Sequence, residues 1–355
     1  ILSLDASYMI QPKTGYIRIN RFGATTAEEF KKAMKELQKQ GMKDMILDLQ
    51  GNGGGYLNAA IDLANEFLGQ KELIVYTEGR TAKRSDFYAK GNGDFRNGRL
   101  IVLVDEYTAS ASEIVSGAVQ DWDRGIIVGR RSFGKGLVQR PIDLPDGSMI
   151  RLTIARYYTP AGRCIQKPYD SSTDYNKDLI ERFNHGELMN ADSIHFPDSL
   201  KVQTKKLGRT VYGGGGIMPD YFVPIDTTLY TDYHRNLVAK GVVIKFTMKF
   251  IEGHRKELAG KYKKFESFNE KFIIDDDMMA TLREMGDKEG VKFNEEQYQK
   301  SLPLIKTQLK ALIARDLWDM NEYFRVMNTT NESVQKALEI LNSDEYQKKL
   351  KVNQH

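Results

Sequence analysis

The stretch LIVLVDEYTASASEIVSGAVQDWDRGIIVG, residues 100–129, carries a complete strand–helix–strand pattern. Its first five residues form an uninterrupted apolar run, which is typical of a parallel strand buried on both faces. A helix is predicted from about Ala111 to Trp122, and residues 125–129 have the pattern of a second buried strand. Because parallel neighbours in a sheet need a crossover connection, usually a helix, this unit predicts an α/β fold.

The residues before this unit repeat the same rhythm. Strands are predicted at 15–22, 44–49 and 72–76, and a helix is predicted at about 56–68. Another helix is expected to begin at the Thr-x-x-Glu capping pattern of residues 25–29, with Phe30, Met34 and Leu37 on one face. Repeated β-α-β units indicate a mostly parallel sheet with helices packed on it.

The pattern after residue 136 predicts the rest of the first domain and a separate helical region. Consecutive strands are expected over 137–158, around a Pro-Asp-Gly turn, and the polar segment 167–210 is predicted to be a surface insertion. The first domain is placed at residues 1–225. Residues 226–355 are dominated by Lys, Glu, Leu, Met and Phe and contain a single proline, Pro303, so they are predicted to be a helical C-terminal region.

Composition narrows the function classes. Hydrophobic residues make up 41% and charged residues 28% of the chain, as in an ordinary globular protein. A net charge of +4 without a basic block gives no support for nucleic-acid binding. The single cysteine, Cys164, excludes an internal disulfide framework. The chain begins at Ile1 without a signal-like segment, so we expect it to be a fragment of a processed or trimmed protein.

Ser110 is a candidate nucleophile at the start of the predicted helix that follows residues 100–104. A strand that leads into a helix places a side chain at the carboxyl edge of the sheet, where open α/β sheets build their sites. The free N–H groups of the helix would face anything bound there, so the backbone N–H of Ala111 could donate to an oxyanion. The alternative is that Ser110 or Ser112 simply caps the helix, the commoner role for a serine at this place.

The segment GNGGG at residues 51–55 also follows a buried strand and precedes a helix. Consecutive glycines allow positive φ angles and a close approach of the backbone to a ligand. Gly54 or Gly55 could therefore supply a second oxyanion N–H. The alternative is an ordinary flexible turn, although three successive glycines favour the functional interpretation.

Lys135 lies in GRRSFGKG, residues 129–136, which nearly matches a phosphate-binding loop. Position 136 is glycine rather than the serine or threonine that would hold magnesium, and the following residues, with Pro141, alternate as in a strand. Nucleotide binding is therefore disfavoured. The remaining alternatives are a surface lysine in a turn and a catalytic base.

A serine needs an adjacent base, and no histidine precedes residue 185. A lysine can take that place if burial favours its neutral form. Gln139 could orient the amine of Lys135 without adding charge. Residues four apart on an extended strand lie about 13 Å apart, so this contact requires Gly134 and Gly136 to fold the loop back.

The five histidines show no metal-ligand spacing with one another or with the cysteine, and ordinary packing or surface roles are expected for them. They are His185, His195, His234, His254 and His355.

Five segments together resemble the C-terminal processing peptidases, also called tail-specific proteases, of the serine–lysine class. They are LDLQGNGGG (47–55), TASASEI (108–114), VGRRSFGKGLVQ (128–139), YYTPAGR (157–163) and GIMPD (216–220). They occur in the order found in that family and lie within residues 15–225.

The resemblance implies roles for individual residues. Ser110 corresponds to the nucleophile, Lys135 to its base and Gln139 to the supporting glutamine. The oxyanion donors would be the N–H of Ala111 and that of a glycine in 53–55, with Gly54 and Gly55 favoured. No metal or organic cofactor would be required.

The resemblance also implies a fold and a setting. The core would be crotonase-like or Clp-protease-like, and the reaction would be endoproteolysis near the C-terminal tails of proteins. An exported, periplasmic location, an adaptor protein and homo-oligomer formation belong to the same expectation. Two alternatives stay open, namely an acyl-CoA-processing enzyme on this fold and a catalytically silent protein that binds peptides or scaffolds a partner.

Three departures from the family pattern stand out. Gln50 occupies a position that is usually arginine, and Thr108 replaces a common serine at a position expected to be structural. Such proteases usually carry a peptide-binding PDZ domain before the catalytic core, and we expect no such domain within this sequence.

Overall fold

The computed structural model describes residues 2–168 and 177–351, and its contacts divide the chain into two compact units. Unit 1 comprises Ile1–Pro224 and Lys336–His355, and unit 2 comprises Ile225–Gln335. The first division therefore falls next to the boundary predicted at residue 225. Residues 336–355, which we had placed with the helical region, group with unit 1 instead.

Unit 1 is built on a six-stranded sheet with the order β1-β2-β3-β6-β7-β12. Its strands are β1 (Leu4–Gln11), β2 (Thr14–Ile19), β3 (Asp44–Asp48), β6 (Leu100–Val104), β7 (Ile126–Gly129) and β12 (Tyr221–Phe222). All neighbouring pairs are parallel except β1 and β2, which form an antiparallel hairpin. The predicted mixed α/β fold with a mostly parallel sheet is confirmed.

Helices cover this sheet because its strands are apolar on both faces. The helices are α1 (Thr26–Lys39), α2 (Leu57–Asn65), α3 (Ala111–Asp121), α11 (Glu332–Asn342) and α12 (Glu345–Leu350). Phe30, Met34 and Leu37 of α1 are buried in one cluster with the sheet residues Ile17 and Met45, as the periodicity predicts. On α12, the hydroxyl of Tyr346 accepts the N–H of Leu100 at 2.9 Å, which ties the C-terminal helix to β6.

The start of α1 differs from the predicted capping box. The Thr25 side chain makes no capping hydrogen bond to the helix and instead donates to the Glu29 carboxylate. That carboxylate accepts the N–H groups of Ser3 and Leu4 at 2.8 and 3.2 Å. The pattern correctly marks where the helix begins, but its glutamate holds the chain before β1 rather than the helix end.

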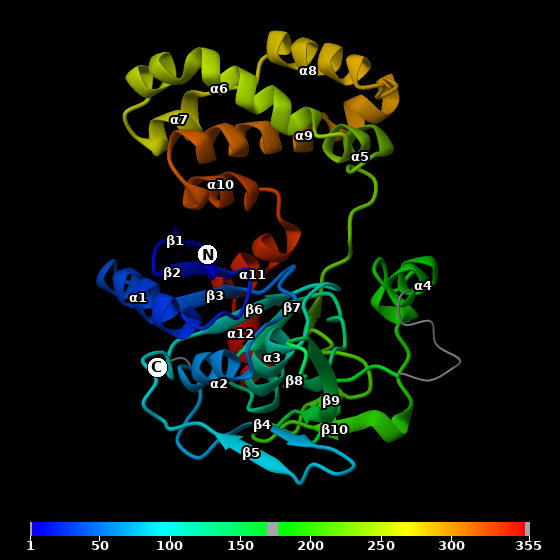
Figure 1. Ribbon diagram of the computed structural model, residues 1–355. Coiled ribbons are helices and arrows are strands. Elements are labelled where there is room, and N and C mark those ends of the chain that lie inside the picture. The colour runs from blue at the N-terminus through cyan, green and yellow to red at the C-terminus, as the bar shows by residue number, and fades with distance from the viewer. Residues whose placement is uncertain (1, 169–176, 352–355) are drawn as a thin grey trace. The chain divides into compact units, whose positions relative to one another are not determined.

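A second, antiparallel sheet has the order β5-β4-β9-β8. Its strands are β5 (Ser85–Tyr88), β4 (Leu73–Glu78), β9 (Met149–Tyr158) and β8 (Leu137–Asp143), labelled in Figure 1. β8 and β9 form the predicted hairpin, closed by a hydrogen bond from the Leu144 N–H to the Ser148 carbonyl at 2.8 Å. The described part of the predicted insertion contains α4 (Asp178–Asn184) and the short antiparallel pair β10 (Lys201–Gln203) and β11 (Thr210–Tyr212).

Unit 2 is helical, which confirms a helical C-terminal region. Its helices are α5 (Asp232–Ala239), α6 (Val242–Lys261), α7 (Phe265–Lys271), α8 (Asp276–Lys288), α9 (Glu295–Leu317) and α10 (Met320–Met327). They enclose an apolar cluster of their own that includes Phe246, Phe268, Ile305 and Leu309. Within the described residues, no helix has the length and apolar character that a membrane span needs.

Candidate active site

Ser110 lies at the N-cap of α3, at the sharp turn that follows β6. Its backbone angles are φ 57° and ψ −114°. An ordinary N-cap residue has extended angles with negative φ, whereas a non-glycine residue with positive φ is strained by about 1–3 kcal/mol. Such strain is typical of functional sites, and a serine on a strained strand-to-helix turn is exposed for attack in other hydrolases. The strained turn is the geometry expected of a nucleophile, and Ser110 and Glu113 also form a capping box at this helix end, so the capping role is present as well.

Asp105 and Thr108 hold the turn that leads to Ser110. The Asp105 carboxylate accepts the N–H groups of Tyr107, Thr108 and Gly51, with one oxygen serving all three. The Thr108 hydroxyl donates to the carbonyl oxygen of Leu49 at 2.9 Å. Burial raises the pKa of Asp105, and the Gly51 N–H opposes that effect. Because these bonds join the serine turn to the start of the glycine loop, the hydroxyl at position 108 has the structural role expected for it.

The glycine loop packs directly on the serine turn. A Cβ atom on Gly54 would lie 2.7 Å from the Ser110 Cβ and 2.9 Å from the Ala111 nitrogen, and Gly54 has φ +98°. Only glycine fits this position. The carbonyl oxygen of Asn52 accepts the Ala109 N–H at 2.9 Å, which fixes the two segments side by side.

The predicted oxyanion donors differ in availability. The Gly54 N–H donates to the Asn52 side-chain oxygen at 2.8 Å, so it is already engaged. The N–H groups of Gly55 and Ala111 form no hydrogen bond with any part of the chain that the structure describes. Of the three predicted donors, only the N–H groups of Gly55 and Ala111 therefore have no acceptor within the described residues.

The loop that carries Lys135 joins β7 to β8. The Gly136 N–H donates to the side-chain oxygen of Gln166 at 2.9 Å, and a Cβ atom on Gly136 would lie 2.5 Å from the Gln166 nitrogen. Gly134, directly before the lysine, has φ +84°, a left-handed backbone conformation that favours glycine. A strand follows rather than a helix, which excludes the phosphate-binding loop. The Lys135 side chain is half-buried and Gln139 is exposed.

Glu113 joins the two loops. Its side chain is fully buried, and its carboxylate accepts the N–H groups of Ser110 and Lys135, each at 2.8 Å, on the same oxygen. The other oxygen accepts the Gly134 N–H at 2.6 Å and the Ser132 hydroxyl at 2.5 Å. Burial raises the pKa of Glu113, and these four donors oppose the rise by stabilising the ionised form.

The sequence alone indicates no more for Glu113 than an acidic residue in the first turn of α3, where it interacts favourably with the helix dipole. The only sequence signal for its role was an acidic residue three positions after a serine. Its partners at 132–135 are distant in sequence, so the sequence did not indicate them. The structure brings the backbones of Ser110 and Lys135 to one carboxylate. No hydrogen bond joins the Ser110 side chain, the Lys135 amine and Gln139 to one another, and all three residues are described.

Arg18 places a guanidinium beside the backbone of Gln50. From β2, its guanidinium contacts the Asp48 carboxylate at 2.6 Å and donates to the carbonyl oxygen of Gln50 at 2.8 Å. The Gln50 N–H donates to the other Asp48 oxygen at 2.8 Å. A guanidinium therefore lies beside the glycine loop although position 50 is not an arginine. Arg18 binds Asp48 and Gln50, two of the residues that directly precede this loop.

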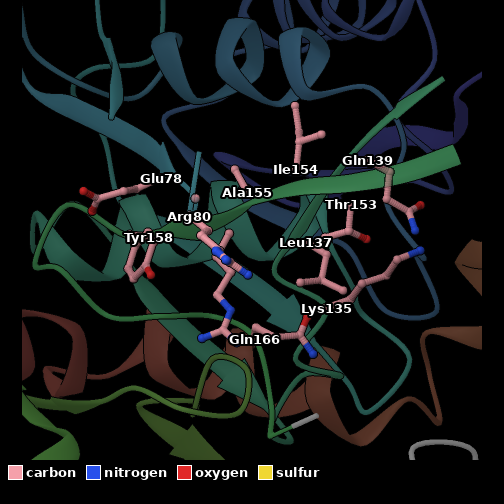
Figure 2. A pocket seen from close by; sticks show the side chains of 12 residues that line it. Glu78, Arg80, Lys135, Leu137, Gln139, Thr153, Ile154, Ala155, Tyr158 and Gln166 are labelled. Atoms are coloured by element: carbon pink, nitrogen blue, oxygen red, sulfur yellow. The ribbon is translucent and has the colours of Figure 1, made fainter. Parts of the chain in front are cut away.

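A cavity of about 830 Å³ lies beside the lysine loop. Lys135 and Gln139 line it together with Gln166, Arg80, Arg156 and Glu78. Figure 2 shows Lys135 and Gln166 close together on one side of this cavity, with Glu78 on the other. The two residues predicted to act with Ser110 therefore face one space that is large enough for a peptide segment.

Two family models match the chain. Residues 13–173 match peptidase family S41, and residues 233–319 match a family of unknown function (DUF8443). The carboxyl-terminal-processing protease of Picosynechococcus sp. is 45% identical over 155 residues, covering 44% of this chain and 37% of that protein. The chloroplastic carboxyl-terminal-processing peptidase 3 of Arabidopsis thaliana is 36% identical over 211 residues, covering 56% of this chain and 40% of that protein.

Among solved structures, the photosystem II D1 C-terminal processing protease matches with a TM-score of 0.44 and 30% identity, covering 61% of this chain and 43% of that one. The chain spans less than half the length of each of these three proteins.

The region that matches the peptidase family includes all three segments of the candidate active site. Residues 13–173, which match the model of peptidase family S41, contain the serine turn, the glycine loop and the lysine loop. The resemblance to the C-terminal processing peptidases is confirmed by the S41 family match and by these relatives.

Proposed function

We propose that this chain is a serine endopeptidase that cleaves near the C-terminal tails of protein substrates. Ser110 forms the acyl-enzyme and Lys135 is the general base. The observation that carries the proposal is the Glu113 carboxylate, which accepts the N–H groups of Ser110 and Lys135 at 2.8 Å each. These two hydrogen bonds connect the strained turn at Ser110 to the loop that carries Lys135, and Lys135 lines an open cavity.

In the first half of the reaction, the Ser110 oxygen attacks the substrate carbonyl carbon and its proton passes to the Lys135 amine. The N–H groups of Ala111 and Gly55 donate to the oxyanion of the tetrahedral intermediate. Lys135 then returns the proton to the leaving amine as the peptide bond breaks. Water attacks the resulting ester, with Lys135 again taking the proton, and free Ser110 is restored.

The lysine side chain completes this arrangement by moving. Hydrogen bonds of a catalytic pair are often long or absent before substrate binds and tighten in the complex. A half-buried lysine on a loop flanked by glycines can swing towards Ser110 while Glu113 keeps the backbone in place. Gln139 then supports the amine from β8.

We propose the finer fold assignment and the cellular setting on the same basis. Residues 1–225 form the catalytic core with a crotonase-like or Clp-protease-like arrangement, supported by parallel strands linked through helices. An exported or periplasmic location, an adaptor protein and homo-oligomers are proposed from the family alone.

A cleavage assay tests the function. An unfolded protein with an apolar C-terminal tail would be incubated with wild type, Ser110→Ala and Lys135→Ala, with Ser116→Ala and Lys32→Ala as matched controls. We expect both active-site variants to lose at least about 100-fold in rate and both controls to cleave as wild type does. Cleavage that survives Ser110→Ala would refute the proposal. Tail binding without any cleavage by wild type would favour the catalytically silent alternative.

A further inference from the structure

The cavity beside Lys135 carries two arginines that the proposed mechanism does not use. Arg80 follows β4 and Arg156 lies on β9, and both line the cavity of about 830 Å³. Figure 2 labels Arg80 among the stick side chains of the cavity that holds Lys135 and Gln166.

The backbone keeps these two arginines together. β4 and β9 pair so that Glu78 lies opposite Arg156. A Cβ atom on Gly79 would lie 2.1 Å from the carbonyl oxygen of Ile154, so the chain before Arg80 presses against β9 at a point that only glycine allows. Two side chains on adjacent, tightly packed segments can therefore reach one ligand.

Neither arginine has an anionic partner within the described residues. The side chains of Arg80 and Arg156 are exposed and form no ion pair or hydrogen bond there, although Glu78 also lines the cavity. Several more buried arginines of unit 1 are paired, for example Arg130 with Glu106 and Arg163 with Asp121. An unpaired pair of guanidinium groups in a cavity is suited to an anion from outside the chain, and guanidinium groups bind carboxylates through two parallel hydrogen bonds.

We propose that this cavity is a substrate subsite for a carboxylate, held by Arg80 and Arg156. The inference rests on the proposed peptidase function. The carboxylate is either an acidic side chain close to the scissile bond or the α-carboxylate at the end of the tail. The arginines, which stay charged, hold it, and Lys135 on the same cavity remains available as the base.

Matched peptides test the subsite. Four peptides of one tail sequence would carry an acidic side chain or its amide near the scissile bond, and a free or amidated C-terminus. Each would be cleaved by wild type, Arg80→Gln, Arg156→Gln and the double variant. Arg151→Gln, an exposed arginine of β9 outside the cavity lining, is the control.

One of the two peptide changes, the side-chain amide or the C-terminal amide, should lower kcat/KM about tenfold or more, because a charge-assisted hydrogen bond is lost. We expect this loss in wild type and in Arg151→Gln, mainly through a higher KM. The same change should alter kcat/KM less than about twofold in the double variant, and added salt should reduce the difference. The amide change that has the effect identifies the source of the carboxylate. Glu78→Gln should strengthen the preference, since it removes the opposing charge.

Equal cleavage of all four peptides by wild type would overturn the subsite, and so would arginine variants that slow every peptide equally. Peptide binding to the Ser110→Ala variant distinguishes failure of the subsite from failure of the proposed peptidase function. If no peptide is cleaved, binding of labelled peptides measured by fluorescence anisotropy still shows whether the subsite exists. Tighter binding of the carboxylate forms that is lost in Arg80→Gln supports the subsite, and equal binding of carboxylate and amide forms refutes it.

Discussion

The serine turn and the lysine loop meet at one carboxylate, yet their functional groups are held very differently. Asp105, Asn52 and Glu113 fix the backbone around Ser110 through hydrogen bonds at 2.8–3.0 Å. The Lys135 backbone is fixed by Glu113 in the same way, but its amine faces a cavity without a hydrogen-bond partner among the described residues. In the proposed mechanism, the nucleophile and its oxyanion donors are thus in place before substrate binds, whereas the proposed base must move to them.

Replacing Glu113 should lower activity more than any other substitution, because its carboxylate binds both the serine turn and the lysine loop. In Glu113→Gln, the amide nitrogen faces two of the four donors, whichever way the side chain is placed, and leaves them unsatisfied in a buried site. We expect kcat to fall at least about 100-fold and the melting temperature to drop. Cleavage kinetics and thermal unfolding measure the two effects.

Ser132→Ala is the matched control for that experiment. It removes one donor to the same carboxylate without touching Ser110 or Lys135. Its kcat should fall clearly less than that of Glu113→Gln, since only one of the four donors is lost and the carboxylate keeps the N–H groups of Ser110, Gly134 and Lys135. If Glu113→Gln lost no more activity than Ser132→Ala, Glu113 would have no special positioning role.

Gly54→Ala tests how closely the glycine loop fits the serine turn. The new methyl group would lie 2.7 Å from the Ser110 Cβ at a φ of +98°, so the loop and the serine must separate. We expect kcat to fall about 100-fold, comparable to losing an oxyanion donor, with a smaller change in KM. Gly53→Ala is the control because nothing lies within 4 Å of its added Cβ. Equal activity of the two variants would contradict the close fit.

Arg18→Gln should have an intermediate effect on the entry to the glycine loop. The substitution removes the guanidinium that contacts Asp48 and the Gln50 carbonyl oxygen. We expect kcat to fall about three- to tenfold at unchanged KM, with partial recovery in Arg18→Lys, because a lysine keeps the charge but only one of the two contacts. A change confined to KM would show that Arg18 acts on substrate binding instead.

Gln139→Ala should have the smallest effect of the series. Gln139 is exposed at the start of β8 and forms no bond to Lys135 among the described residues. Its support for the amine can arise only when substrate closes the site, so we expect a two- to fivefold loss in kcat. Arg140→Ala, the adjacent exposed residue, should cleave as wild type does. A loss above about 100-fold would mean that the base is prepositioned after all.

The sequence was sufficient where local pattern decides the structure. Apolar periodicity placed Phe30, Met34 and Leu37 in the core, and the strand after Lys135 followed from its alternation and Pro141. The position of Ser110 at the start of α3 was also predictable, because it depends only on the segment before and after it.

What the sequence missed depends on contacts between distant segments. Glu113 gathers residues that lie 19 to 22 positions later, and nothing in its own neighbourhood indicates those partners. The engagement of the Gly54 N–H by Asn52 depends on a side-chain rotamer. The grouping of residues 336–355 with unit 1 rests on long-range contacts such as the hydrogen bond between Leu100 and Tyr346.

The rate at which Ser110 is acylated tests the central claim most directly. A serine-reactive fluorophosphonate would be added to wild type and Lys135→Ala, and the modified residue would be located and timed by mass spectrometry. The account predicts labelling at Ser110 that is at least about 100-fold slower in Lys135→Ala, because general-base catalysis contributes about 10² to 10⁴. Labelling at Ser110 that is equally fast in both proteins would contradict it.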